Sequence, residues 1–253
     1  MDTAAFPCDD MLVSLPLFQG VGLTEVQRLV TAARLVHYDK GSVFLAQGQH
    51  VTRCFIMIEG WCGASKGNIQ GQETILQIFG RGDFLPEPDK ITMAEPSIVN
   101  FQTLTPVQLI SLPPAIVQET LERSSIFMAN MLTASARRTQ ELRDHIEQLT
   151  LHNAEERVGR FLLQIRFNCS ADGKDIMLPF DKALIAAYLG IKPETFSRAL
   201  QAFREKGFVI DRNRLIVPDR EALCEYCDQV AMRSCQFAHT DTCVNSSHGD
   251  ADL

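Results

Sequence analysis

The chain lacks a long hydrophobic run, because no window of 18 residues is both apolar and uncharged. We therefore expect no membrane-spanning helix and no membrane partner. The first residues also lack the basic start of a secretory signal, and Pro7, Asp9 and Asp10 interrupt their apolar stretch. We expect a cytoplasmic protein, in which the eight cysteines are mostly thiols or metal ligands rather than disulfides.

An excess of positive charge is also missing, since the formal net charge of the 253 residues is -7. This argues against a general binder of polyanions. The charge is unevenly distributed, however: residues 151–222 hold 12 basic and 10 acidic residues, whereas the rest of the chain holds 12 basic and 21 acidic ones. Positive charge is thus concentrated where it could meet phosphate, and the acidic remainder limits nonspecific binding.

The motifs of common enzymes are missing as well. Residues 63–67 satisfy the pattern G-x-S-x-G, but we expect a hairpin turn there rather than the strand-to-helix elbow of a nucleophilic serine. Residues 80–82 lack the third glycine and the following helix of a dinucleotide site, and no P-loop occurs. We therefore expect no enzymatic activity.

Short apolar runs punctuated by glycine fill residues 38–112. The runs 55–59 and 74–79 have the length of strands and are rich in residues that favour strands. Strands at such spacing predict a β-sandwich or barrel. A helix over 25–36, with Thr24 as its N-cap, is predicted to precede it. The length of the chain leaves room for a second domain.

A long helix is predicted over 114–152, which contains no glycine. One line of positions follows the spacing 4, 3, 4, 3, 4, 3, the heptad pattern of a helix that packs on a partner helix. These positions are Met128, Leu132, Ser135, Thr139, Leu142, Ile146 and Leu149. We interpret them as a homodimer seam; the alternative is a helix packed on its own barrel. The other faces, with Arg137, Arg138 and Glu141, are polar and are expected to point outward.

A helix-turn-helix is predicted over 181–206. Ala186, Gly190 and Phe196 have its spacing: the small residue lets the helices approach, the glycine turns the chain, and the phenylalanine holds the second helix on the core. Residues 208–217 are expected to form a hairpin, so the unit is winged.

The second helix presents Glu194, Ser197 and Arg198 near the end that enters the major groove in this motif. Arginine pairs with guanine, glutamate accepts from cytosine, and serine reaches either kind of base edge. We therefore predict that these three residues read bases; the alternative is an ordinary polar helix face. The candidates for phosphate contact are Lys192, Arg204, Lys206, Arg212 and Arg214.

Together these segments resemble the CRP/FNR family of bacterial transcription regulators, over roughly residues 12–222. The resemblance rests on Pro193-Glu-Thr-Phe-Ser-Arg-Ala-Leu, on Asn153-Ala-Glu-Glu-Arg-Val, and on the glycine-spaced strands with Phe55-Ile-Met-Ile-Glu-Gly. It is strongest for the FNR-type and nitric-oxide-responsive, DNR-like branches.

The resemblance implies an α+β protein with four parts. These are an N-terminal helix with a cyclic-nucleotide-binding-type β jelly roll (1–113), a dimerisation helix (114–152), a C-terminal winged helix-turn-helix (153–222) and a Cys-rich tail (223–253). It also implies a homodimer that binds double-stranded DNA and works with RNA polymerase. In this branch, residues that match Glu194, Ser197 and Arg198 read a TTGAT-type half-site repeated as a palindrome.

The nucleotide-binding cassette of this family departs from its usual pattern here. Such a site needs a cation for the phosphate and a carboxylate for the ribose, and the family supplies Gly-Glu followed by Arg-Ser or Arg-Thr. This chain has no arginine between Arg81 and Arg123. Asp83 and Glu87 supply only anions, and Lys90 is a weak substitute. We therefore expect no cyclic nucleotide to bind.

The tail is rich in cysteine. Cys224 and Cys227 form a CxxC motif, and Cys235 and Cys243 follow, with gaps of 2, 7 and 7 residues. Four thiolates this close can hold zinc or an iron–sulfur cluster, although the spacing matches neither a usual zinc finger nor a ferredoxin. Three interpretations stay open: a metal or iron–sulfur site, a thiol redox switch, or a flexible tail with incidental cysteines.

The N-terminal cysteine cluster of FNR is absent, since only Cys8 lies there. Haem is a further candidate cofactor, by analogy with the DNR-like branch, with His37 and His50 as its candidate ligands. The expected function is a homodimeric, sequence-specific transcription regulator that responds to a redox, gas or metal signal rather than to cyclic AMP. The alternative is a redox or metal-binding carrier that uses the tail cysteines without specific DNA recognition.

Overall fold

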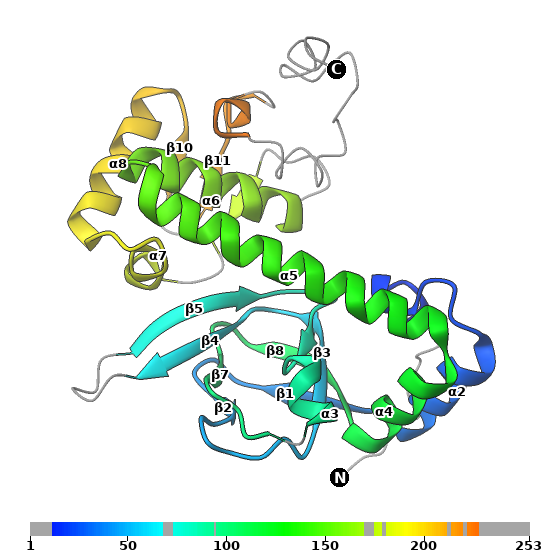
Figure 1. Cartoon of the computed structure of the whole chain (residues 1–253). Helices are drawn as coiled ribbons and strands as arrows, with labels where there is room; N and C mark the ends of the chain where they lie inside the picture. The colour runs from blue at the N-terminus through cyan, green and yellow to red at the C-terminus, as the bar shows by residue number, and fades with distance from the viewer. Residues whose placement is uncertain are drawn as a thin grey trace. The chain divides into compact units, whose positions relative to one another are not determined.

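The computed structural model describes residues 12–67, 73–93, 95–169, 175–178, 181–211, 214–219 and 222–227. The chain divides into two compact units, Met1–His145 and Ile146–Leu253. Helix α5 (Ser125–Leu151) begins in the first unit and ends in the second (Figure 1). Within the described ranges, every helix is too short or too polar to cross a membrane.

Two four-stranded antiparallel sheets form the body of the first unit (Figure 1). Their strand orders are β1-β8-β3-β6 and β2-β7-β4-β5. The strands are β1 (Arg34–Tyr38), β2 (Val43–Leu45), β3 (Cys54–Glu59), β4 (Cys62–Gly67), β5 (Glu73–Phe79), β6 (Phe84–Leu85), β7 (Asn100–Thr103) and β8 (Val107–Leu112). The predicted β jelly roll is confirmed.

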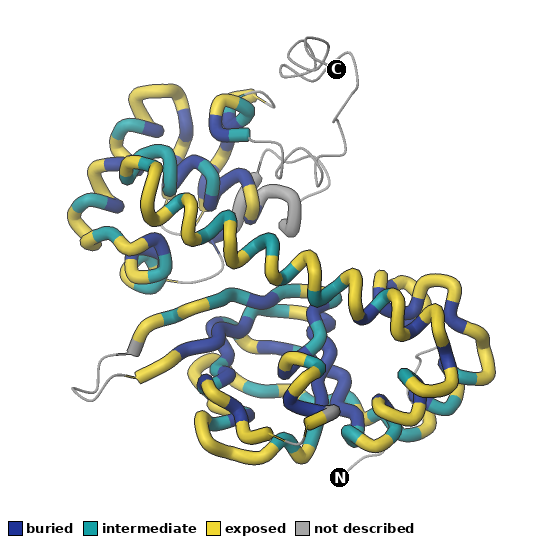
Figure 2. The backbone as a smooth tube through the Cα atoms, viewed as in Figure 1, coloured by how far each residue is buried: buried dark blue, intermediate teal, exposed yellow. Residues whose placement is uncertain are grey.

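Strand β3 is buried on both faces, which explains why its sequence is a continuous apolar run rather than an alternating one (Figure 2). Met57 belongs to the core between the two sheets, together with Phe101. Ile56 points to the opposite core, where the sheet meets the helices. In that second core, the rings of Phe18 and Phe127 lie 5.8 Å apart. The sheet therefore carries the helical layer on one face.

The bounds predicted for the first helix, 25–36, are wrong at both ends. Helix α2 (Leu23–Ala32) has Gly22 rather than Thr24 as its N-cap. It stops before Arg34, because the next five residues pair with β8 as strand β1. Strand pairing at this position outweighs the helical spacing of the sequence. A 3₁₀ turn, η1 (Pro16–Phe18), precedes the helix.

The segment predicted as one helix over 114–152 contains two helices, α4 (Pro114–Arg123) and α5. Ser124 separates them, with an extended backbone. Its side-chain oxygen accepts a hydrogen bond from the backbone N–H of Phe127 at 3.1 Å, as an N-cap does. The break turns the chain so that Phe127 enters the core beside the sheet.

A short helix, α3 (Pro88–Thr92), lies between β6 and β7.

The second unit is a small helical domain with a three-stranded sheet in the order β10-β11-β9. Asn153 opens its first helix with a capping box: its side chain accepts from the N–H of Glu155 and Glu156, and Glu156 accepts from the N–H of Asn153. The elements are α6 (Ala154–Cys169), β9 (Asp175–Met177), α7 (Lys182–Tyr188), α8 (Pro193–Glu205), β10 (Val209–Asp211), β11 (Arg214–Ile216) and η2 (Cys224–Tyr226). The predicted winged helix-turn-helix is confirmed.

Candidate nucleic-acid interface

The turn between α7 and α8 depends on Gly190. This residue has a φ of +63°, which side chains rarely adopt, and a Cβ atom there would lie 2.9 Å from a methyl carbon of Leu149. On either side of the turn, Ala186 and Phe196 are fully buried. These three positions therefore do what the sequence predicts: they turn the chain and pack α8 against α7.

Helix α8 has one buried and one exposed face. The buried side chains are Phe196, Ala199, Leu200 and Phe203. The three predicted base-reading residues, Glu194, Ser197 and Arg198, are all exposed in the N-terminal half of the helix. Their spacing of three and four residues puts them on one side. The fold thus places a glutamate, a hydroxyl and a guanidinium on one exposed side of the helix.

The predicted phosphate contacts fall into two groups. Lys192, Arg204 and Arg214 are exposed, and Arg212 lies outside the described residues. Lys206 is exposed as well, but its Nζ lies 2.8 Å from Glu225, 2.8 Å from the Tyr226 hydroxyl and 2.9 Å from Glu155. Hydrogen bonds to Glu225, Tyr226 and Glu155 raise the pKa of Lys206. This amine is paired within its own domain although its side chain is 41% exposed, and its contact with phosphate stays a prediction.

Arg157 joins the end of α5 to the helix-turn-helix. Its guanidinium donates to the carbonyl oxygen of Leu149 at 2.7 Å, to that of His152 at 2.9 Å and to that of Leu189 at 3.1 Å. These carbonyls come from the last turn of α5, the residue after it, and the residue after α7. One arginine side chain therefore joins three segments of the second unit.

The predicted seam residues lie along α5, and the apolar ones are exposed in the single chain. Leu132 is 70% exposed and Ile146 is 61% exposed; Met128, Leu142 and Leu149 are also exposed. Of the two polar positions in the middle, Thr139 donates to the carbonyl oxygen of Ser135, one turn earlier on the same helix, at 3.0 Å. The helix thus carries a line of apolar side chains that its own chain does not cover.

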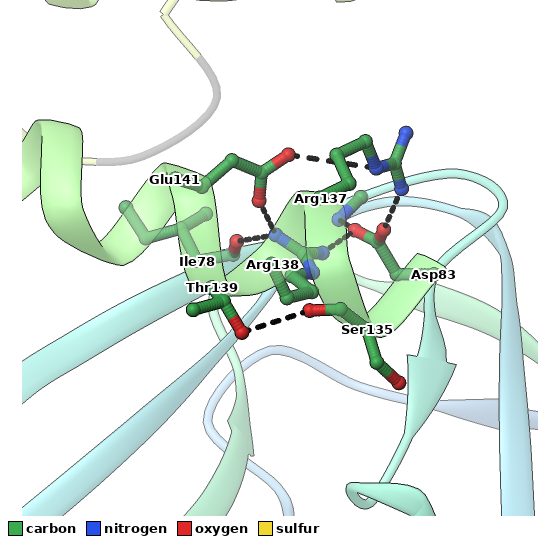
Figure 3. Close-up of polar contacts among 8 residues, drawn as sticks. Ile78, Asp83, Ser135, Arg137, Arg138, Thr139 and Glu141 are labelled. Carbon is green, nitrogen blue, oxygen red and sulfur yellow. Dashed lines mark hydrogen bonds and ion pairs between the residues drawn. The ribbon is translucent and has the colours of Figure 1, made fainter. Parts of the chain in front are cut away.

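The arginines of α5 do not all point outward, contrary to expectation. Arg137 donates to the carboxylate of Asp83 at 2.9 Å, and Arg138 pairs with both Asp83 and Glu141 (Figure 3). Asp83 lies in the turn between β5 and β6 and is only 8% exposed; its carboxylate also accepts from the N–H of Gly80, at 2.7 Å. We call Asp83, Arg137, Arg138 and Glu141 the barrel–helix cluster.

Arg138 is the central member of the barrel–helix cluster (Figure 3). Its guanidinium lies 4.4 Å from the ring centre of Phe79 and also donates to the carbonyl oxygen of Ile78. Burial opposes its charge, but the carboxylates of Asp83 and Glu141 outweigh burial and raise the pKa of Arg138. Nothing local in the sequence distinguishes it from its neighbour, because the partner that buries it lies more than 50 residues away.

Lys90, the weak substitute for a phosphate-binding arginine, also forms ion pairs within the chain. Its Nζ lies 2.8 Å from Glu95 and 3.0 Å from Asp89, and the lysine is only 8% exposed. Hydrogen bonds to Glu95 and then Asp89 raise the pKa of Lys90. The acidic residues of this loop therefore neutralise its only lysine.

The candidate cofactor ligands are dispersed. Cys54 and Cys62 are fully buried in the first unit; burial raises the pKa of Cys54 to about 12 and raises that of Cys62 further, as expected for apolar core residues. His37 and His50 are exposed. The described ranges contain no group of three or more metal-ligating side chains. Cys8, Cys235 and Cys243 lie outside these ranges, so the predicted tail site is represented only by Cys224 and Cys227.

A helix with exposed polar residues at its start, packed across a second helix and followed by a small sheet, defines a winged helix-turn-helix DNA-binding domain. Two family models match the chain: a cyclic nucleotide-binding domain over residues 35–124 and a Crp-like helix-turn-helix domain over residues 156–226. The chain belongs to the CRP/FNR family of transcription regulators.

Individual relatives agree with this assignment. The CRP-like cAMP-activated global transcriptional regulator of Mycobacterium tuberculosis is 24% identical over 220 residues, which cover 85% of this chain and 97% of that protein. The probable transcriptional regulator flp of Lacticaseibacillus casei is 26% identical over 199 residues, covering 77% and 87%. The structure of FixK2 from Bradyrhizobium japonicum has a TM-score of 0.69 and 18% identity, covering 78% and 98%, and supports the fold.

Proposed function

We propose that the chain is a homodimeric regulator that reads a TTGAT-like palindrome through Glu194, Ser197 and Arg198. The observation that carries the proposal is the joint exposure of these three side chains at the start of α8. Lys192, Arg204 and Arg214 are exposed on the same domain and supply charge for the phosphate backbone. The regulator works in the cytoplasm together with RNA polymerase.

The proposed dimer rests on α5. The exposed line from Met128 to Leu149 has heptad spacing, and pairing with a second helix would remove its apolar side chains from water. In a two-fold dimer, the two copies of α8, which we call the reading helices, would face half-sites about 34 Å apart along the duplex, as a palindrome requires.

The proposed signal is redox, gas or metal rather than cyclic AMP. Asp83, the carboxylate in the cassette, already binds two arginines of its own chain, and Lys90 already binds two carboxylates. A nucleotide would have to displace both sets of ion pairs. The relative from Mycobacterium tuberculosis is cAMP-activated. In this chain, Asp83 and Lys90 already form ion pairs and are not available to a nucleotide. Titration calorimetry with cyclic AMP should give no heat, and a dissociation constant in the micromolar range would refute this part.

The tail cysteines or a haem are the places where such a signal could act. His37 and His50 are too exposed to favour a haem pocket, whereas Cys224 and Cys227 lie together on the DNA-binding unit. Zinc or an iron–sulfur cluster would need Cys235 and Cys243 as further ligands. Elemental and sulfide analysis of anaerobically purified protein tests for both, and its absorption spectrum tests for haem.

A gel shift with purified protein tests the DNA-binding proposal. We expect the palindrome to be bound far more tightly than a scrambled duplex of the same length and composition. Equal retention of the two duplexes would favour the carrier function, in which the helix-turn-helix plays no part.

The seam is tested separately. Leu132→Glu should give a monomer in sedimentation analysis and should weaken binding to the full palindrome by roughly 100-fold, because the second half-site contact is lost. Leu23→Glu replaces an equally exposed leucine on α2 and serves as the matched control. A dimeric Leu132→Glu protein would show that the seam lies elsewhere.

A further inference from the structure

Tyr226 packs against the buried face of the reading helix α8. Tyr226 is only 7% exposed, and its ring centre lies 5.5 Å from that of Phe203 on α8. Gly159 on α6 leaves the room for it, since a Cβ atom there would lie 2.4 Å from the tyrosine ring. The Tyr226 hydroxyl accepts from Lys206, the C-cap residue that follows α8. This contact fixes the C-terminal end of the reading helix to α6.

Two cysteines flank this contact at a spacing that suits a disulfide. The N–H of Cys227 donates to the carbonyl oxygen of Cys224 at 3.0 Å, so the four residues form a closed turn. Such a turn keeps the first and fourth Cα atoms within about 7 Å, and a disulfide needs roughly 4.4–6.8 Å. In a 3₁₀ turn, side chains three residues apart lie on the same side. Tyr226, which belongs to η2, therefore points away from the cysteines, into the core.

Both cysteines are thiols, and both are partly exposed. They differ in this from Cys54 and Cys62, which are thiols buried in the first unit. A reagent in solution therefore has access to the first pair and not to the second. Exposure and turn geometry together distinguish Cys224 and Cys227 from Cys54 and Cys62, the other cysteines whose side chains the structure describes.

We propose that Cys224 and Cys227 are a modification site that forms a reversible disulfide by exchange with a low-molecular-weight disulfide. One protein thiolate attacks a sulfur of the reagent, forms a mixed disulfide and releases one reagent thiolate. The second protein thiolate then attacks the protein sulfur of the mixed bond and releases the other. The two cysteines lose two electrons and two protons, and the reagent is reduced to two thiols.

The bond would lock the turn that carries Glu225 and Tyr226. In the reduced protein, one backbone hydrogen bond closes this turn, whereas in the oxidised protein a covalent ring does. The oxidised form should hold Tyr226 and Lys206 in place for a larger fraction of time. Its reading helix is then better ordered before DNA arrives, so DNA should bind more tightly. This last consequence rests on the proposed function; the chemistry of the bond does not.

The first experiment tests the bond itself. The full-length protein with Cys235→Ser and Cys243→Ser is equilibrated with mixtures of oxidised and reduced glutathione, then alkylated, digested and analysed by mass spectrometry. We expect a Cys224–Cys227 disulfide that disappears on reduction. Persistent glutathione adducts at these cysteines, or unmodified thiols throughout, would overturn the proposal. So would zinc or iron held by Cys224 and Cys227 in the protein with all its cysteines.

The second experiment tests the consequence. Hydrogen exchange should be slower in the oxidised protein over residues 222–227 and at Lys206, and the affinity for the palindrome should rise about fivefold or more. The same protein carrying Cys227→Ser should show neither change on treatment with glutathione. A bond that forms without slowing exchange would refute the bracing role. If the reduced protein does not bind the palindrome at all, the proposed function fails while the bond remains tested by mass spectrometry.

Discussion

Arginines serve opposite purposes in the two units. In the first, Arg138 lies between two carboxylates and an aromatic ring, with its side chain 21% exposed, and it pairs with both carboxylates. In the second, Arg198 is exposed at the start of α8 beside Glu194 and Ser197. The first guanidinium connects a helix to a barrel, whereas the second is the one that we propose contacts DNA. The comparison teaches that two arginines on helices can differ in role because they differ in burial and in their ion pairs.

Of the three arginine substitutions, we expect Arg138→Ala to have the largest effect, on the free energy of unfolding. Arg138→Ala leaves the carboxylate of Asp83 with much less compensation in a nearly buried position, so the free energy of unfolding of the first unit should fall by about 3 kcal/mol. Denaturant unfolding measures this, and Arg143→Ala, an exposed arginine on the same helix, is the matched control. A variant as stable as its control would show that the barrel–helix cluster does not hold the helix.

A smaller effect is expected at Arg198, and in a different measurement. Arg198→Ala should weaken binding to the palindrome by about 1–3 kcal/mol and relax the choice at one base pair, with unfolding unchanged. Fluorescence anisotropy on a set of single-base variants checks both parts. Arg34→Ala removes an exposed arginine on β1 and should leave binding unaltered. A uniform loss over all sequences would reassign Arg198 to phosphate contact.

The smallest effect is expected for Arg137, which shares a contact with Arg138 but is exposed as Arg198 is. It contacts Asp83 as Arg138 does, but its side chain is 54% exposed, so water screens the pair. Arg137→Ala should therefore lower the free energy of unfolding by less than about 1 kcal/mol. A loss as large as that of Arg138→Ala would mean that contact with Asp83, rather than burial, sets the energy.

The sequence was informative where a feature depends on nearby residues. Ala186, Gly190 and Phe196 predicted the helix-turn-helix because their spacing is local, and the exposed triad followed from the helical period. The seam spacing likewise placed one apolar line on α5. The break at Ser124 was missed, because it arises where Phe127 packs into a core formed by distant strands.

Charged residues were the least predictable. Arg138 was expected to point outward, yet it pairs with Asp83, more than 50 residues away along the chain, and Lys206 likewise pairs with Glu155. A charged side chain carries no local mark of its partner, so spacing and composition could not reveal either contact. The candidate site predicted from the sequence therefore contains one exposed lysine that already has partners within its own domain.

The three carbonyl oxygens held by Arg157 have a mechanical consequence. They tie the last turn of α5 directly to the residue that precedes the Gly190 turn, so these parts cannot rotate independently without losing charge-assisted hydrogen bonds. If two α5 helices pair as proposed, a change in their winding would therefore reach α8 as a rotation of its whole exposed face. Arg157 is the residue that would couple these two movements.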